Sequence, residues 1–231
     1  MAPIKGLIFD FNGTLFFDSE LHLRAFFEAF ARYGAEPRDN EFMLRTFFGR
    51  SNEDIFRGFY VPGASDELLA DFEEYKESRY QQLILAEPDR YRISDDICRM
   101  LDFLKNSDIP YCIATGSPKL NVDFYLKELG LDRWFSYDNI IYATGEFSGK
   151  PAPDIYLIAA KRLGLTPADC AVFEDGTSGI TAAKAAGAGK IIAVWEEGYP
   201  SPLRDGLTVD ETHHDFKDWK RIFSSLFEKS F

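Results

Sequence analysis

Acidic, basic and hydroxyl side chains follow the short apolar segments of this 231-residue chain. Asp10 ends the first of these segments, and Thr115 ends the second. Lys150 follows the third in a Gly-Lys-Pro stretch, and Glu174 and Asp175 close the fourth. Together they would supply three carboxylates, a hydroxyl group and an ammonium group.

This set of groups makes chemical sense as one site. Three clustered carboxylates repel one another unless a cation lies among them, and an oxygen-only cluster suits Mg²⁺. A carboxylate such as that of Asp10 can attack phosphorus and form an acyl phosphate. The cation and Lys150 would offset charge on the transferring group, while Thr115 and nearby backbone N–H groups hold its oxygens. The pattern therefore favours metal-assisted phosphoryl transfer.

The segments that must position these residues are typical of a parallel sheet. Short apolar runs have the composition of strands buried on both faces. They span residues 6–10, 109–115, 139–143, 170–174 and 190–195, with a weaker run at 207–209. Helical patterns occupy residues 95–104, 120–129, 154–163 and 179–186. This alternation predicts a doubly wound α/β fold, in which the functional groups meet at the carboxyl edge of the sheet.

The segment between residues 18 and 88 interrupts this alternation. It contains helical patterns and no convincing strand, and its first helical pattern, over residues 19–33, ends at a glycine. The sequence therefore predicts an inserted all-helical cap domain at residues 18–88. Residues 1–17 and 89–231 would form the α/β core.

Charge and composition narrow the range of partners. Acidic residues outnumber basic ones, 38 to 26, which gives a formal net charge of −12. Such a surface repels nucleic acid and anionic lipid, so neither is an expected partner. No apolar run has the length of a membrane span, and the N-terminus lacks the pattern of a signal peptide. We expect a cytoplasmic protein, monomeric or weakly homo-oligomeric, that binds a small molecule.

The chemical motifs, taken in order, resemble those of the haloacid dehalogenase-like hydrolase superfamily, whose core is Rossmann-like. The matching residues are Asp10-x-Asn12-Gly13-Thr14, Thr115, Lys150 and the pair Glu174-Asp175. Each motif alone is weak, whereas the ordered set is specific. The helical insert resembles the cap of the subgroup that contains β-phosphoglucomutase and small sugar-phosphate phosphatases. Residues 49–55 resemble the loop of that cap which contacts the substrate.

The resemblance implies roles for individual residues, with Mg²⁺ as cofactor and a small phosphorylated metabolite as substrate. The implied catalytic residues are Asp10 as nucleophile, Asn12 and Lys150. The implied metal ligands are Asp10, Asn12 through its backbone carbonyl, Asp175, and Glu174 in the inner or outer shell. The implied substrate-binding residues are Thr115, Gly116, Ser117, Arg50 and His22. His22 could equally be an exposed helix histidine, and Arg50 a solvated arginine.

Position 12 departs from the family pattern. Most phosphatases of the family have a second aspartate here, which protonates the leaving oxygen and then deprotonates the attacking water. The amide of Asn12 can do neither near neutral pH. Because general acid–base catalysis contributes roughly 10²–10⁴-fold, we expect slow ester hydrolysis. Asn12→Asp should raise turnover on sugar phosphates by roughly a hundredfold or more.

The sequence leaves more than one function open. A phosphatase of a small metabolite is favoured by the acidic pair Glu174-Asp175, which provides metal-binding groups. A dehalogenase would use Asp10 without metal, but such relatives usually carry tyrosine at position 12 and lack the acidic pair. A third hypothesis is a catalytically impaired protein that binds a phosphorylated ligand. An asparagine introduced by design to trap a complex would give the same sequence.

Overall fold

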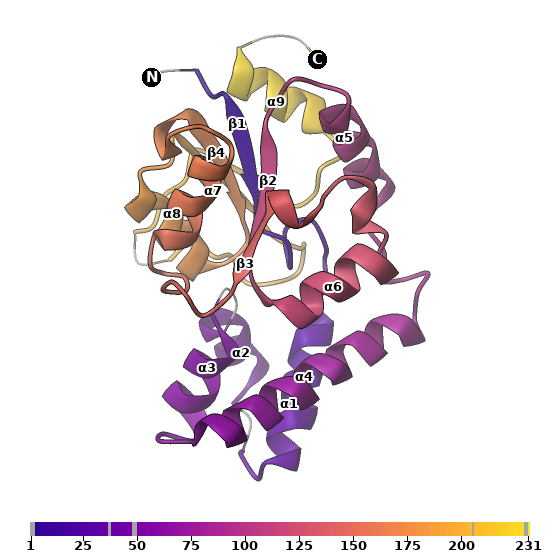
Figure 1. Cartoon of the computed structure of the whole chain (residues 1–231), viewed down its shortest axis with the longest axis vertical. Helices are drawn as coiled ribbons and strands as arrows, with labels where there is room; N and C mark the ends of the chain where they lie inside the picture. The colour runs from indigo at the N-terminus through magenta and orange to yellow at the C-terminus, as the bar shows by residue number, and fades with distance from the viewer. Residues whose placement is uncertain (1–2, 37, 48–49, 205, 229–230) are drawn as a thin grey trace.

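The computed structural model describes residues 3–36, 38–47, 50–204, 206–228 and 231. Its centre is a six-stranded sheet with the strand order β3-β2-β1-β4-β5-β6, in which neighbouring strands are parallel (Figure 1). The strands are β1 (Gly6–Phe9), β2 (Tyr111–Pro118), β3 (Ile140–Ala143), β4 (Cys170–Glu174), β5 (Lys190–Val194) and β6 (Glu211–His213). The predicted doubly wound parallel sheet is therefore confirmed.

Helices connect the strands and cover both faces of the sheet (Figure 1). They are α1 (Ser19–Arg32), α2 (Asn40–Thr46), α3 (Asn52–Ile55), α4 (Asp66–Ala86), α5 (Asp95–Lys105), α6 (Lys119–Glu128), α7 (Asp154–Arg162), α8 (Thr177–Ala186) and α9 (Trp219–Phe227). A π-helical turn, η1 (Phe56–Tyr60), continues α3, and short 3₁₀ turns lie at η2 (Leu131–Arg133), η3 (Tyr137–Asn139) and η4 (Pro167–Asp169). Serine side chains cap several helices. Ser65, for example, accepts a hydrogen bond from the backbone N–H of Leu68 at the start of α4.

Alternation along the strands supplies an apolar core on each face of the sheet. In β1, Leu7 and Phe9 belong to the apolar cluster that includes side chains of α5, α6 and α9, whereas Ile8 belongs to the cluster with α7 and α8. All three side chains are at most 1% exposed. Successive strand residues point to opposite faces, so the uninterrupted apolar run of β1 packs against helices on both sides.

The helices α1 to α4 form a separate layer beyond the carboxyl ends of β1, β2 and β3 (Figure 1). Phenylalanines fill their common interior, and Phe56 and Phe72 stack with ring centroids 4.1 Å apart. This is the predicted all-helical cap. The boundaries at residues 18 and 88 stay a prediction, since the helices themselves run from Ser19 to Ala86.

Two C-terminal elements differ from the sequence expectations. The sixth strand is β6, so the weak strand predicted at residues 207–209 is wrong. Leu207 and Val209 instead pack, partly buried, against the apolar cluster on the α7 and α8 face. The helix α9 was not predicted. Its residues Trp219, Ile222 and Phe223 are buried along one side of the helix. In the part of the chain that the structure describes, no helix combines the length and apolar character that a membrane span requires.

Candidate active site

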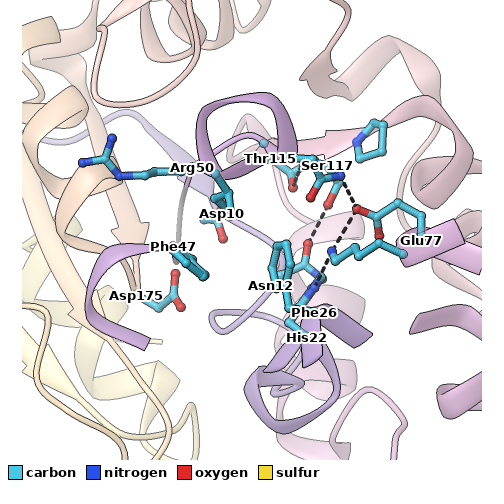
Figure 2. A pocket seen from close by; sticks show the side chains of 15 residues that line it. Asp10, Asn12, His22, Phe26, Phe47, Arg50, Glu77, Thr115, Ser117 and Asp175 are labelled. Carbon is cyan, nitrogen blue, oxygen red and sulfur yellow. Dashed lines mark hydrogen bonds and ion pairs between the residues drawn. The ribbon is translucent and has the colours of Figure 1, made fainter. Parts of the chain in front are cut away.

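A cavity of about 80 Å³ lies where the carboxyl edge of the sheet meets the cap (Figure 2). Most residues predicted for the site line it, namely Asp10, Asn12, His22, Arg50, Thr115, Gly116, Ser117 and Asp175. Lys150 and Glu174 are buried in contact with this group, 3% and 0% exposed. Gly49, the first residue of the predicted cap loop, lies outside the described residues. The fold thus brings together residues that are far apart in sequence.

Lys150 is the electrostatic centre of the core side of the site. Its Nζ donates to Oδ1 of Asp10 at 2.6 Å, to the carbonyl of Ala114 at 3.2 Å and to Oε1 of Glu174. Burial opposes the charge of Lys150, but the two carboxylates outweigh burial and raise its pKa above the usual range. Lys150 is therefore a fixed ammonium group that orients Asp10.

Glu174 is saturated by donors from the protein. Besides Lys150, the hydroxyl of Tyr156 donates to Oε1 at 2.7 Å, and the backbone N–H of Gly176 donates to Oε2 at 2.9 Å. Gly179 packs so closely that a Cβ there would lie 1.8 Å from Oε1. These contacts hold Glu174 in place behind Lys150, which suits a supporting position in the outer shell.

Asp10 and Asp175 are under electrostatic strain as carboxylates. Burial raises the pKa of Asp10 to about 7, Lys150 opposes this effect, and the charge of Glu174 adds to it. Burial also raises the pKa of Asp175 well above its usual range, with further contributions from Glu174 and Asp10. A bound cation would relieve this repulsion and favour the ionised forms.

The donor set fits a divalent cation such as Mg²⁺. Carboxylate oxygens of Asp10, Glu174 and Asp175 lie within 4.8 Å of one another, and oxygen ligands are those that Mg²⁺ prefers. Among the described residues, none donates a hydrogen bond to Asp175. Gly13 adopts φ +75° beside this carboxylate, and a Cβ at Gly13 would lie 1.9 Å from its Oδ2. Only glycine permits this close approach.

Hydroxyl groups and backbone at the end of β2 face the same cavity. Thr115 is 2% exposed, and its Oγ1 accepts a hydrogen bond from the backbone N–H of Ser117 at 3.1 Å. The register of β2 against β3 is irregular between Ala114 and Pro118. Gly116 also lines the cavity, with no atom within 4 Å of a Cβ built at this position. This stretch offers hydroxyl and N–H donors to an anion.

Asn12 is held at both ends of its amide. Its Nδ2 donates to Oδ2 of Asp18 at 2.6 Å and contacts the hydroxyls of Tyr125 at 2.9 Å and Tyr80 at 3.0 Å. Its Oδ1 accepts from the hydroxyl of Ser117 at 2.7 Å. The amide therefore belongs to a polar network that joins the core to the cap.

His22 is part of this network and is not an exposed helix histidine, since its side chain is only 14% exposed. Its ring stacks on Tyr80 with centroids 4.1 Å apart. Nδ1 lies 3.0 Å from Nζ of Lys76, and Nε2 lies 3.3 Å from Oδ2 of Asp18. Because an ammonium group can only donate, Nδ1 accepts and Nε2 carries the proton toward Asp18. Arg50 also lines the cavity, although it is exposed.

Several polar residues of the cavity were not predicted. Lys76 and Glu77 form a buried ion pair at 2.9 Å on α4. Glu77 also accepts from Asn52 of α3 and from Asn121 of α6, each at 2.7 Å. The helix α4 is rich in charge, and no motif in the sequence singled out Lys76. The signal was weak, because contacts between the cap and the core decide which charges are buried.

The sheet topology, the inserted helical cap and the acidic edge around Lys150 are typical of one class of hydrolase that has a parallel α/β core. The family model of the haloacid dehalogenase-like hydrolases matches residues 4–187. The chain belongs to this family, as the motifs at Asp10, Thr115, Lys150 and Glu174 predicted.

Similar proteins place it more narrowly. It is 30% identical to the fructose-1-phosphate phosphatase YqaB of Escherichia coli, over 79% of this chain and 92% of that protein. It is also 30% identical to the β-phosphoglucomutase of Bacillus subtilis, over 80% of each chain. The crystal structure of a haloacid dehalogenase-like hydrolase of family IA, variant 3, from Entamoeba histolytica superposes with a TM-score of 0.79, at 36% identity and with 93% and 95% of the two chains covered.

Proposed function

We propose that this protein is a Mg²⁺-dependent phosphatase that acts on a small phosphorylated metabolite through an aspartyl phosphate on Asp10. The observation that carries the proposal is the buried Lys150 ammonium group, which engages both Asp10 and Glu174 at the cavity. Lys150 occupies Oδ1 of Asp10, while no described residue donates to Oδ2. This second oxygen is the attacking atom. The named activity of the relative YqaB, on a sugar phosphate, supports the substrate class.

In the first step, Oδ2 of Asp10 attacks phosphorus and the bond from phosphorus to the leaving oxygen breaks. Lys150 and the donors around Thr115 stabilise the charge of the transferring group. In the second step, water attacks the aspartyl phosphate, which releases inorganic phosphate and the free carboxylate. Asp10, Asp175 and the backbone carbonyl of Asn12 would hold Mg²⁺, which supplies positive charge beside the phosphoryl oxygens.

Asn12 makes both steps slower than in relatives with a second aspartate. Its amide can neither protonate the leaving oxygen nor accept a proton from water, and both of its ends are already occupied by neighbours. A leaving group must therefore depart unprotonated. Aryl and acyl phosphates should react much faster than alkyl phosphates, and breakdown of the aspartyl phosphate should limit turnover.

The two alternative functions, a dehalogenase and a protein that only binds a phosphorylated ligand, would require different groups at this site. A dehalogenase would not require the carboxylate of Asp175 beside Glu174, to which no described residue donates a hydrogen bond. The Asn12 network does favour a second candidate, a protein that binds a phosphorylated ligand without turning it over. Formation of an aspartyl phosphate separates this candidate from the enzyme.

Rapid-quench kinetics with nitrophenyl phosphate and Mg²⁺ test the proposal. We expect a burst of about one nitrophenolate per protein molecule, followed by slow turnover, and a phosphorylated Asp10 in the quenched protein by mass spectrometry. Glycerol phosphate should give no burst. Asp10→Asn is the matched control and should abolish the burst while leaving the fold intact. Binding of phosphate without any phosphorylated protein would favour the second candidate.

A further inference from the structure

Asp18 is a buried carboxylate that the proposed reaction does not use. It is 1% exposed and lies directly before α1. Its Oδ2 accepts from Nδ2 of Asn12 at 2.6 Å and from the hydroxyl of Tyr80, and its Oδ1 accepts from the backbone N–H of Gly13 at 3.1 Å. The Nε2–H of His22 also faces Oδ2, at 3.3 Å. All these contacts bring donors to a carboxylate that can only accept.

The position of Asp18 determines how the Asn12 amide is oriented. With Nδ2 toward Asp18, the carbonyl Oδ1 is free to accept from Ser117. The reverse orientation would place two acceptor oxygens 2.6 Å apart, at the distance now occupied by the hydrogen bond. A buried pair of acceptors without a proton between them is strongly unfavourable.

We propose that Asp18 is a positioning residue of this site, which fixes the Asn12 amide and makes an amide, not a carboxylate, the group that fits at position 12. The Asp18 carboxylate thus lies one hydrogen bond away from the side chain at position 12. The kinetic consequence of this inference rests on the proposed function, whereas its structural consequence does not.

Asn12→Asp alone should therefore fall short of the acceleration expected from sequence. The introduced carboxylate would face Asp18 without a donor between them, and the site would lose its fixed geometry. Combining it with Asp18→Asn exchanges the two groups. The amide introduced at position 18 can accept from the N–H of Gly13 and donate to the carboxylate at position 12, so that this hydrogen bond persists with its direction reversed. The Tyr80 hydroxyl, 3.0 Å from the side chain at position 12, can then donate to that carboxylate, whereas the Nε2–H of His22 loses its acceptor.

Steady-state turnover of glycerol phosphate with Mg²⁺ tests the exchange. We expect the double variant Asn12→Asp/Asp18→Asn to exceed Asn12→Asp by at least about tenfold in kcat, with a smaller change in KM. Asp18→Asn alone should not accelerate the reaction, because the acid–base carboxylate is still absent. Measured well below the Tm of every variant, an increase in kcat that appears only beside Asn12→Asp cannot result from restored stability alone.

The matched control neutralises a different buried carboxylate of the same cavity. Glu77 is 3% exposed and contacts Lys76, Asn52 and Asn121. The variant Asn12→Asp/Glu77→Gln should remain at or below the turnover of Asn12→Asp. Equal acceleration by this control would show that net charge, and not the place of Asp18, matters, and would overturn the proposal.

Thermal unfolding in EDTA near neutral pH decides the inference even if no variant hydrolyses a phosphate ester. Asn12→Asp should lower Tm by roughly 5 °C or more, because it buries a second carboxylate against that of Asp18 with no proton between the facing oxygens. The exchange of both residues should recover at least about half of this loss, because the hydrogen bond between the two positions returns while the Nε2–H of His22 loses its acceptor. If Asn12→Asp alone kept the wild-type Tm, or the double variant were no more stable than Asn12→Asp, Asp18 would not determine the group at position 12. Absence of turnover in every variant would count against the proposed function alone.

Discussion

Lys150 is the residue whose charge allows two other charges to be buried. Asp10 and Glu174, 6% and 0% exposed, both accept from its ammonium group. A buried carboxylate without a partner is costly, and removal of one member of a buried ion pair leaves an uncompensated charge. Sequence reasoning assigned Lys150 to phosphoryl binding. The structure adds that this lysine also stabilises the folded site.

Lys150→Met should lower the free energy of unfolding by roughly 3–5 kcal/mol near neutral pH. Chemical denaturation in EDTA measures this effect apart from catalysis. Lys190→Met is the matched control, since Lys190 pairs with Asp210 at 2.8 Å but both side chains are about 30% exposed. We expect the control to lose at most about 1 kcal/mol. Equal losses in the two variants would mean that Lys150 does not stabilise the buried carboxylates.

At the scale of elements, the strand ends and the turns after them could be predicted from the sequence. Buried parallel strands have a recognisable apolar run, and polar residues directly after them must lie at the carboxyl edge. The core half of the site, with Asp10, Thr115, Lys150 and Asp175, follows from this rule. The cap half does not. Lys76 is buried only because α4 packs against α1 and the core, and no local pattern encodes that contact.

The network around Asn12 shows the same limit more sharply. The sequence revealed an amide at position 12, where the family resemblance implies a carboxylate, since this follows from a single position. It did not reveal that Asp18, Tyr80 and Tyr125 surround this amide, because the two tyrosines lie 68 and 113 residues away. Side chains that meet across the core and the cap depend on the angle at which helices pack, which one sequence does not specify.

The turn after β1 provides a prediction about a single element. Gly13 and Gly145 both adopt a left-handed backbone, with φ of +75° and +77°. A Cβ at Gly13 would lie 1.9 Å from the Asp175 carboxylate, whereas a Cβ at Gly145 has nothing within 4 Å. Both alanine variants pay the cost of a positive φ, about 1 kcal/mol, but only Gly13→Ala also displaces Asp175.

Calorimetry with Mg²⁺ separates these two effects. Gly13→Ala should weaken Mg²⁺ binding by roughly tenfold or more, because the shifted carboxylate no longer faces Asp10. Gly145→Ala should bind Mg²⁺ as the wild type does and lose only the stability that the strained backbone costs. Wild-type affinity in Gly13→Ala would remove Asp175 from the proposed metal site.

At the scale of the whole molecule, the sheet and the cap together concentrate acidic groups where water is scarce. The chain carries a formal net charge of −12. Water weakens the repulsion between charges at the surface, whereas the buried carboxylates at the cavity repel one another strongly. Tertiary packing keeps Asp10 and Asp175 buried despite this repulsion. The stability of the metal-free fold should therefore depend on pH in a way that a bound cation would reverse.

In EDTA, the two buried carboxylates Asp10 and Asp175 should make the free energy of unfolding fall as pH rises. Burial raises the pKa of Asp10 to about 7 and that of Asp175 well above its usual range. A group with a raised pKa in the folded state stabilises the fold below its ordinary pKa, near 4, and this contribution is lost as pH rises through the folded value. Asp175→Asn keeps a neutral side chain at every pH. In EDTA it should be more stable than the wild type at about pH 8, with this advantage absent at about pH 4.

Denaturation of wild type and Asp175→Asn between about pH 4 and pH 8 measures the difference in their free energies of unfolding. At about pH 8, saturating Mg²⁺ should make the wild type the more stable protein, because the cation favours its ionised carboxylates. Asp169→Asn is the control, because the pKa of Asp169 is shifted in the opposite direction. The hydrogen bonds of Asp169 with Lys5 and Thr166 lower its pKa to about 2, so its contribution is present above the ordinary pKa and is lost only in acid. Its removal should leave the slope between about pH 5 and pH 8 unchanged. If the free energies of unfolding of wild type and Asp175→Asn changed with pH in parallel, the repulsion inferred at the cavity would be contradicted. A carboxylate free of burial and of that repulsion would keep its ordinary pKa.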